Sequence, residues 1–295
     1  MEGQFRNDSF EGEGSYINPD GSRLQGTWVD GELTGEGEEL DENGVIVYEG
    51  DFKGGVRSGK GKLFFYEGAR LRGTFVDNVP QGDCAYYYPN GSSLRGKWKD
   101  GEMVSAKYYD NEGKASGTAI YHLDESTKDH LNDMPLLSDP YEFELVYVKP
   151  STIPNSGEGL FAKEDLPANF VCSFYNGIRI SLKNANKKTW RANANNISLN
   201  NGTCVDIPPE YNDCQKVYCA TLGHKANHHP KNNAMYDTYY NHPRFGKIKC
   251  IRTLVDVKKD DEIFVDYGYK KGTGPLWYRA YEKEKRRTDG NGDLH

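Results

Sequence analysis

The first hundred residues repeat, and this periodicity restricts the possible folds of the chain more than any other feature of the sequence. Five glycines follow one another at steps of 23, 24, 23 and 23 residues: Gly3, Gly26, Gly50, Gly73 and Gly96. An aromatic residue stands two positions after each glycine: Phe5, Trp28, Phe52, Phe75 and Trp98. Further glycines recur nine, eleven and eighteen positions after the first in most units. The pattern decays in the last unit, as is usual for a terminal repeat.

Each unit has the pattern of a β-hairpin. A short aromatic strand ends at a turn that contains glycine, where the backbone takes a positive φ. A second strand such as residues 62–65 follows, and an Asx-Gly turn such as Asn90-Gly91 ends the unit. One hairpin cannot bury its own aromatic face, so we expect the units to stack into an elongated antiparallel sheet. The spacing resembles the MORN repeat family over residues 1–122. The chain opens inside a repeat, as a fragment or a short form lacking earlier units would.

The resemblance leaves two roles open for the repeats. They either dock a membrane lipid or a protein, or they form a rigid sheet that extends and shields the next domain. Residues 1–50 carry 13 acidic and 2 basic residues, which disfavours binding to anionic lipid. We therefore favour a scaffold or a protein-docking role.

Charge is distributed unevenly along the chain. Residues 1–150 carry 28 acidic and 15 basic side chains, whereas residues 151–295 carry 16 acidic and 22 basic ones. This distribution argues against a general nucleic-acid binder. An acidic surface favours cationic partners, although a soluble surface without a chosen partner fits equally well. No stretch approaches the ~18 consecutive apolar residues of a membrane span.

The cysteines indicate a reducing compartment. They stand at positions 84, 172, 204, 214, 219 and 250, without a Cys-x-x-Cys pair or a histidine at zinc-like spacing. The start MEGQFRND lacks the basic and apolar regions of a secretory signal. We expect reduced, mostly buried thiols in a cytosolic or nuclear protein.

The second half has a different pattern. Periodic glycine stops after Gly117, and the acidic stretch that follows, with Pro135 and Pro140, reads as a linker. Short β-rich runs then recur, at residues 144–148, 170–175, 197–199, 249–254 and 262–265. Only residues 181–194 and 275–286 have helical patterns. These runs predict an irregular sheet of short strands. No glycine-rich loop links a strand to a helix, which argues against a Rossmann or P-loop nucleotide site.

Three clusters could carry chemistry. They are Ser156-Gly157-Glu158-Gly159-Leu160-Phe161, then Leu222-Gly223-His224-Lys225-Ala226-Asn227-His228 with Asn233 and Tyr236, then Asp261-Glu262-Ile263-Phe264-Val265-Asp266-Tyr267-Gly268-Tyr269. Each alone fits an ordinary turn or core strand. The spacing of His224 and His228 also suggests a metal pair on a helix, but no third ligand accompanies them, so we expect no metal site.

In this order, the clusters resemble the SET-domain protein-lysine methyltransferases over residues 140–282. That family has an early G-x-G-type segment, and its later Asn-His and Tyr segments form a pseudoknot around S-adenosylmethionine. The resemblance implies a mainly β fold, in which the stacked MORN sheet precedes a short-strand SET domain and a C-terminal helix. MORN repeats before a SET domain resemble the members that monomethylate lysine four of histone H3 and also modify non-histone proteins. Three further segments are similar to these members: Ser173-Phe174-Tyr175-Asn176-Gly177, Gly223-His224-Lys225-Ala226-Asn227-His228 and His242-Pro243-Arg244-Phe245-Gly246.

The implied reaction requires a water-poor aromatic channel. Methyl transfer from a sulfonium is an in-line displacement by a neutral amine. Presenting neutral lysine at pH 7 costs about 4–5 kcal/mol, given a free pKa near 10.4. Desolvation in an apolar channel and the adjacent sulfonium charge both lower that pKa. Tyrosine suits the channel wall, because its ring excludes water and its hydroxyl can orient the amine.

The resemblance assigns roles to individual residues. It implies three catalytic channel tyrosines, Tyr175, Tyr236 and Tyr267, of which Tyr267 orients the methyl group or relays the proton. It implies cofactor contacts from Ser156, Gly157, Glu158, Asn227, His228 and Trp277, with Trp277 stacked on adenine. It implies substrate contacts from Tyr175, Ala194, Asn195, His228, Lys249, Tyr267 and Tyr269, with the peptide added to a sheet edge near Ile197. Tyrosine at position 236 goes with a single methyl in the product.

Two departures from the family pattern bear on the cofactor. The usual Asn-His-Ser-x-x-Pro-Asn segment here has His229 in place of serine and its proline two places early, at Pro230. Four residues after Trp277, Tyr281 stands where a cofactor-binding carboxylate is usual. These departures keep a rival open, in which the chain is a non-catalytic docking scaffold that binds a basic protein partner.

The expected organisation has five parts. They are MORN repeats over 1–122, a linker over 123–139, a SET domain over 140–270, a C-terminal helix over 271–287 and a disordered tail over 288–295. We expect a monomer in the nucleus, on chromatin, with the cytoplasm as a second location. Its partners would be the histone H3 tail and other lysine-bearing proteins, without direct nucleic-acid binding. The basic run at 283–287 either aids nuclear entry or is a solvated helix end.

Overall fold

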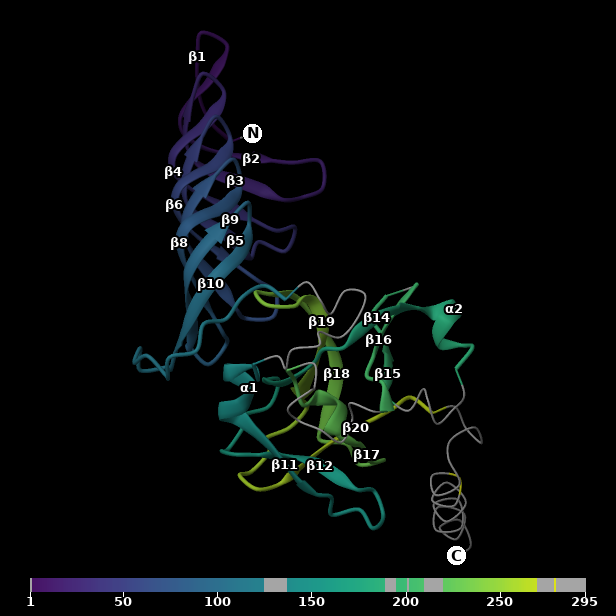
Figure 1. The fold of residues 1–295 in the computed structure, drawn as a ribbon. Helices are drawn as coiled ribbons and strands as arrows, with labels where there is room; N and C mark the ends of the chain where they lie inside the picture. Colours follow the sequence, from purple (N-terminus) through teal and green to yellow (C-terminus); the bar gives the residue numbers. More distant parts are fainter. Residues whose placement is uncertain are drawn as a thin grey trace, which may run out of the picture.

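The protein folds into an elongated sheet followed by a part built from short strands (Figure 1). The computed structural model describes residues 2–124, 137–188, 195–200, 202–209 and 220–269, together with Arg279. Within them, strands far outnumber helices, so the prediction of a mainly β fold is confirmed. In the described residues, no helix has the length and apolar character that a membrane crossing requires.

The N-terminal part is one antiparallel sheet of ten strands in sequence order, which confirms the predicted stack of hairpins. The strands are β1 (Glu2–Arg6), β2 (Ser9–Ile17), β3 (Arg23–Val29), β4 (Glu32–Leu40), β5 (Ile46–Lys53), β6 (Val56–Phe64), β7 (Arg70–Val76), β8 (Val79–Tyr87), β9 (Ser93–Lys99) and β10 (Glu102–Tyr109). The periodic aromatic side chains Trp28, Phe52, Phe75 and Trp98 are buried, whereas Phe5 on the outer strand is exposed.

The repeated glycines make room for close neighbours as well as for turns. Gly61 pairs with Gly50 and Gly73 on the adjacent strands. A Cβ atom at Gly61 would lie 2.2 Å from the hydroxyl oxygen of the buried Tyr48. At Gly96 the neighbour is backbone, because a Cβ atom would lie 2.0 Å from the carbonyl oxygen of Ser105. Positive φ, the reason given for glycine from the sequence, is therefore not the whole explanation. At Gly61 and Gly96 glycine is favoured because neighbouring atoms approach the backbone closely.

The second part contains three small sheets, ordered β11-β12-β20-β17, β13-β19-β18 and β14-β16-β15. Its elements are α1 (Pro140–Leu145), β11 (Val146–Pro150), β12 (Glu158–Ala162), β13 (Val171–Tyr175), β14 (Ile178–Ser181), α2 (Leu182–Ala185), β15 (Asn196–Ser198), β16 (Thr203–Asp206), the 3-10 helix η4 (Gly223–Lys225), β17 (Asn227–His228), β18 (Ala234–His242), β19 (Gly246–Thr253) and β20 (Glu262–Val265).

The predicted strand at 262–265 is confirmed, and the other predicted strands are found with shifted ends. The expected strand at 144–148 was wrong at its start, because Glu144 and Leu145 end helix α1. Asp139 caps that helix and Pro140 opens it, a signature in the sequence that indicates a helix start. The expected helix at 181–194 is described only as α2 and a following turn. Apart from Arg279, the expected C-terminal helix and tail lie outside the described residues.

Tyrosines join the long sheet to the second part. The ring of Tyr88 stacks on Tyr141 of α1, with 4.6 Å between ring centroids. The buried hydroxyls of Tyr86 and Tyr239 hydrogen-bond at 2.7 Å. The hydroxyl of Tyr108 donates to Glu144 at 2.6 Å. One hydrophobic core therefore runs from the repeats into the second part.

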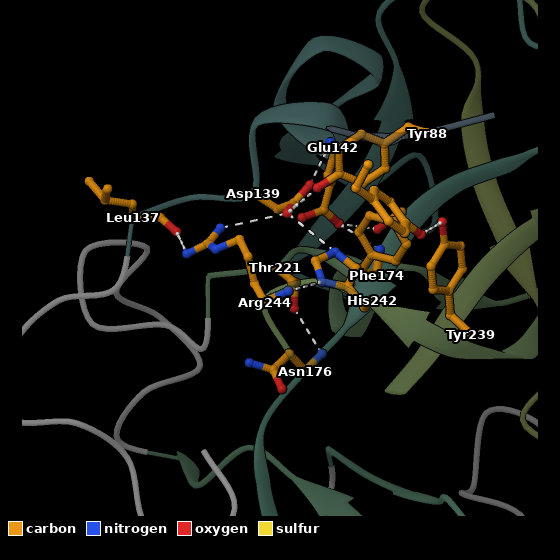
Figure 2. Close-up of polar contacts among 12 residues, drawn as sticks. Tyr88, Leu137, Asp139, Glu142, Phe174, Asn176, Thr221, Tyr239, His242 and Arg244 are labelled. Atoms are coloured by element: carbon orange, nitrogen blue, oxygen red, sulfur yellow. Dashed lines mark hydrogen bonds and ion pairs between the residues drawn. The ribbon is translucent and has the colours of Figure 1, made fainter. Parts of the chain in front are cut away.

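A buried polar cluster completes this junction (Figure 2). Asp139 lies 3.3 Å from the imidazole Nε2 of His242 and 3.6 Å from the guanidinium of Arg244. Burial acts to raise the pKa of Asp139, but the hydrogen bond from His242 and the nearby charges outweigh it, so that pKa is lowered. The segment 242–246, identified in the sequence by resemblance, therefore begins at the junction.

The four cysteines among the described residues are buried and free, as expected for a protein with reduced thiols: Cys84, Cys172, Cys204 and Cys250. Burial raises the pKa of Cys250 to about 12 and also raises that of Cys172. These thiols are therefore structural side chains and not reactive ones.

Replacing Gly96 by alanine should destabilise the repeat sheet by about 1–3 kcal/mol, because the new methyl group would overlap backbone atoms. Gly202→Ala is the matched control, since a Cβ atom there has no neighbour within 4 Å. Urea unfolding of the two variants measures the difference. Equal midpoints for Gly96→Ala and the wild type would contradict the close-approach argument.

The junction should fail at alkaline pH. Burial raises the pKa of Tyr86, Tyr88, Tyr141 and Tyr239 well above the usual value. Above pH 10 the unfolded chain releases phenol protons that the folded chain retains. Stability therefore falls with rising pH by up to about 1.4 kcal/mol per pH unit for each tyrosine. Tyrosinate absorbance and circular dichroism, followed together, should change in one transition. Reversible ionisation of all tyrosines near pH 10 in a protein that stays folded would refute this.

Candidate functional site

Three predicted tyrosines, distant in the sequence, meet in the second part. Tyr175 ends β13, Tyr236 lies in β18, and Tyr267 follows β20. Ring centroids are 6.0 Å apart for Tyr175 and Tyr236, and 6.2 Å apart for Tyr236 and Tyr267. Tyr175 is buried, while Tyr267 is 39% exposed. The three phenols thus form a continuous row from the interior to the surface.

The Asn-His segment fixes the outer tyrosine. Strand β17 pairs in parallel with β20, which places His228 opposite Val265. The backbone N–H of Tyr267 donates to Nδ1 of His228 at 3.0 Å. The hydroxyl of Tyr267 donates to the carbonyl oxygen of Ala226 at 2.9 Å. The second and third sequence clusters therefore form one unit.

The phenols of Tyr236 and Tyr267 stay protonated at neutral pH. Burial raises the pKa of Tyr236 well above its usual value, and the neighbouring phenols of Tyr267 and Tyr175 raise it further. Burial also raises the pKa of Tyr267, with a further contribution from Tyr269. At pH 7 these hydroxyls can orient a ligand, but none of them is a ready base.

The two histidines of the second cluster are uncharged at neutral pH. Burial lowers the pKa of His224 to about 3. Burial also lowers the pKa of His228, although Asp266 opposes it from 3.4 Å. The ring of His228 lies 5.5 Å from that of Tyr267 and 5.2 Å from that of Tyr269. His228 therefore belongs to the aromatic cluster as a neutral ring.

His224 and His228 do not lie on one helix, as the alternative of a helix-borne metal pair required. His224 lies in η4, a 3-10 helix of three residues, and His228 lies in strand β17. Among the described residues, no group of three His, Cys, Asp or Glu side chains could hold a metal ion.

The first cluster lies against the second. The carboxylate of Glu158 pairs with Nζ of Lys225 at 2.8 Å. The side-chain amide of Asn227 donates to the carbonyl oxygen of Glu158 at 2.9 Å and to Glu262 at 3.2 Å. Ser156 and Gly157 lie in the exposed loop before β12, and a Cβ atom at Gly157 would meet no neighbour within 4 Å. An open loop with unobstructed backbone thus borders the Asn-His segment.

Sequence reasoning gave Glu262 no role, although it stands in the third cluster. Its buried carboxylate accepts hydrogen bonds from Ser151 at 2.6 Å and from the backbone N–H of Thr152 at 2.7 Å, besides that from Asn227. A Cβ atom at Gly159 would lie 2.2 Å from this carboxylate, so a side chain there would displace Glu262 from its hydrogen bonds. In the sequence, Gly159 next to Glu158 was the sign of a close contact. The spacing of the residues could not show that Glu262 is the neighbour of this glycine.

A further small sheet packs beside the tyrosines. Ile197 of β15 and Tyr236 pack against a buried cluster that includes Tyr175 and Val205. Among the described strands, β15 and β14 are the two outer strands of this sheet. The predicted substrate residue Asn195 directly precedes β15, and its carbonyl oxygen accepts from the N–H of Ile207 at 3.0 Å.

Lys249 lies on the inner strand β19, in register with Tyr175 on one side and Thr238 on the other. Its ammonium group donates to the hydroxyl of Thr238 at 2.9 Å, and burial lowers its pKa.

Of the remaining predicted residues, Ala194 and Trp277 lie outside the described residues, as does the departure at Tyr281. The departure at His229 is accommodated, because its N–H donates to Val265 and its ring packs on Phe264 at 4.9 Å.

Two family models match the chain. The MORN repeat model matches residues 2–23, 25–46, 48–70 and 72–93, ending before the decayed fifth unit. The SET domain model matches residues 157–268, a range that contains all three tyrosines and the three sequence clusters except Ser156 and Tyr269.

A histone-lysine N-methyltransferase SETD7 of Halocynthia roretzi is 40% identical to this chain over 222 residues. The alignment covers 68% of this chain and 57% of that protein, so the chain spans little more than half of the relative's length.

Two structures of the Chaetomium thermophilum Polycomb Repressive Complex 2 are similar in part. One, autoinhibited and bound to S-adenosylmethionine, is 22% identical with a TM-score of 0.35 and covers 48% of this chain and 17% of that one. The other, a humanized mutant bound to an inhibitor, is 23% identical with a TM-score of 0.34 and covers 47% and 16%. At such TM-scores the likeness is weak.

With its repeat sheet matched by one model and its tyrosine-bearing part by the other, the chain is a MORN-repeat protein with a SET domain.

Proposed function

We propose that this protein transfers a methyl group from S-adenosylmethionine to the side chain of a protein lysine. The observation that carries the proposal is the row of three phenols beside the Asn-His segment. Such a row offers a water-poor wall for an amine at one side and hydroxyl groups to orient it. The similarity to a histone-lysine methyltransferase supports the same reaction.

The residues around the 156–158 loop suit the cofactor. Ser156, Gly157 and Glu158 lie in an exposed segment, the side chain of Asn227 bonds to Glu158, and His228 directly follows Asn227 in β17. A zwitterionic amino-acid group needs both donors and acceptors, which exposed backbone and amide groups provide. Trp277 would add stacking on adenine. When bound, S-adenosylmethionine supplies a methyl group activated by the sulfonium charge.

The tyrosines act by exclusion of water and by orientation. The substrate ammonium loses its proton to water before transfer, and desolvation among the rings favours the neutral amine. Since the O–H of Tyr267 is donated to Ala226 and its oxygen accepts from the hydroxyl of Tyr236, one lone pair remains to accept from the amine or the methyl group. Near-attack alignment then supplies much of the rate. No tyrosinate is needed, in keeping with the raised pKa of Tyr267 and Tyr236.

The substrate peptide would bind at the edge of β15, with Asn195, Lys249 and Tyr269 alongside. An extended peptide can add to an outer strand through main-chain hydrogen bonds. We propose lysine four of histone H3 as one target and lysines of non-histone proteins as others. Tyr236, packed between Tyr175 and Tyr267, leaves little room for a methylated amine, which favours one methyl per lysine. A monomeric enzyme of the nucleus and cytoplasm fits these substrates.

A non-catalytic docking scaffold is the second candidate, and the repeat sheet favours it. A groove of about 1150 Å³ runs across the sheet over its glycines. Acidic side chains line its N-terminal half, among them Glu13, Glu36 and Glu38. A basic protein segment would complement this half. A scaffold of this kind predicts partner binding without turnover.

Replacing Asn227 by alanine should weaken S-adenosylmethionine binding at least tenfold, about 1.4 kcal/mol. The change removes the amide that joins the 156–158 loop to the Asn-His segment. Calorimetric titration measures the affinity, with the exposed Asn111→Ala as control. Absence of binding heat from the wild type itself would overturn the enzyme proposal and leave the scaffold.

Tyr236→Phe should shift the product from monomethyl-lysine towards dimethyl-lysine, because loss of the hydroxyl enlarges the amine pocket. Tyr240→Phe on the same strand is the matched control, since Tyr240 is 50% exposed. Mass spectrometry of a methylated lysine peptide measures the ratio. An unchanged ratio in Tyr236→Phe, or mostly trimethyl product from the wild type, would exclude this pocket.

A further inference from the structure

We infer that Glu142 of helix α1 is a positioning residue for methyl transfer, because it holds the strand that carries Tyr175 against the segment that carries Asn227 and His228. The catalytic role of Glu142 rests on the proposed function. The contacts of Glu142 with the two segments are seen in the structure and do not depend on that function.

The carboxylate of Glu142 binds two chain segments at once (Figure 2). Its Oε1 atom accepts from the hydroxyl of Ser173 and from the backbone N–H of Phe174 at 3.0 Å, both on β13. The backbone N–H of Leu222 donates to Oε1 at 2.9 Å and to Oε2 at 3.0 Å. Glu142 itself is only 1% exposed. One buried carboxylate thus joins β13 to the residue that precedes η4.

Both segments lead directly into the candidate site. Tyr175 follows Phe174, and the chain runs from Leu222 through η4 to Asn227 and His228. The two segments also pack without space for a side chain between them. A Cβ atom at Gly223 would lie 2.5 Å from the carbonyl oxygen of Phe174. A change of the distance between β13 and Leu222 would therefore move the substrate side of the site relative to its cofactor side.

Helix α1 is itself anchored to the repeat sheet. Asp139 caps it by accepting from the N–H of Glu142 at 3.2 Å, and Tyr88 of the repeat sheet donates to Asp139 at 3.4 Å. The N–H of Asp139 donates to the carbonyl oxygen of Ala220 at 2.8 Å, close to Leu222. The repeat sheet thus supports the site through a short path, from Tyr88 through Asp139 and Glu142 to the site.

An apolar residue could not replace Glu142. All the groups that contact its carboxylate are donors, and a leucine would leave the N–H groups of Phe174 and Leu222 buried without a partner. Burial raises the pKa of Glu142 to about 8, while the hydrogen bonds from Ser173 and Leu222 oppose that rise. A neutral glutamine retains the Oε1 acceptor for Ser173, Phe174 and Leu222, although its NH2 group replaces Oε2 beside the N–H of Leu222. The geometry and not the charge is therefore the expected requirement.

The test compares Glu142→Ala, Glu142→Gln and Glu144→Ala in the full chain, at a temperature where all three are folded. Glu144 lies on the same helix but binds Tyr108 of the repeat sheet and not the site. Glu142→Ala should lower kcat about 100-fold, as expected for a small misplacement of reacting groups. KM for the peptide and the affinity for S-adenosylmethionine should change much less. Glu142→Gln should recover most of kcat, and Glu144→Ala should keep it.

A second readout does not depend on activity. With 3-fluorotyrosine incorporated, the ¹⁹F resonance of Tyr175 is assigned by its loss in Tyr175→Phe. Glu142→Ala should shift this resonance, and Glu144→Ala should leave it in place. If the wild type proves inactive, the proposed function fails while this measurement still tests the positioning role.

Two results would overturn the inference. One is an equal loss of kcat in Glu142→Ala and Glu144→Ala. The other is an unmoved Tyr175 resonance in Glu142→Ala. Where Glu142→Ala does not fold, Ser173→Ala replaces it, since it removes one donor to Oε1. That folded variant must lower kcat and shift the resonance, or the positioning role is refuted.

Discussion

The two-residue parallel pairing of β17 with β20 determines the candidate site, because it brings chain segments more than thirty residues apart into contact. It sets His228 beside Val265, and the bonds from Tyr267 to His228 and Ala226 follow from it. Two pairs of residues give little stability by themselves. Asn233 reinforces the arrangement, since its side-chain amide bonds to the backbone of Glu262 and Phe264 at 2.9 and 2.8 Å.

The repeat sheet contributes rigidity to this site. Tyrosines at the C-terminal end of β8 enter the core of the second part. Tyr86 lies in that strand and bonds to Tyr239, and Tyr88 follows it and stacks on Tyr141. The carboxylate of Glu67 also accepts the backbone N–H groups of Tyr240 and Asn241. A sheet that shares a close-packed core with the next part transmits strain to it and holds it in one arrangement. The repeats therefore support the candidate site structurally, and they also present a separate surface, the groove across the sheet.

The sequence predicted what is periodic or local. The antiparallel sheet of stacked hairpins followed from glycine and aromatic spacing, and the strand at 262–265 from its β-branched and aromatic run. Convergence of Tyr175, Tyr236 and Tyr267 came from resemblance, since no spacing rule brings them together. Helix α1 was missed although Asp139-Pro140 signalled it. The roles of Glu142 and Glu262 were beyond sequence reasoning, because their partners are backbone N–H groups and side chains in other segments.

The most direct measurement of the central claim is transfer of a labelled methyl group. The protein is incubated with S-adenosylmethionine labelled in its methyl group and a histone H3 tail peptide. A second peptide with arginine at position four serves as the comparison. The account predicts label on the lysine peptide and none at position four of the arginine peptide. Absence of label on every lysine-bearing peptide and protein offered, despite measurable cofactor binding, would contradict it.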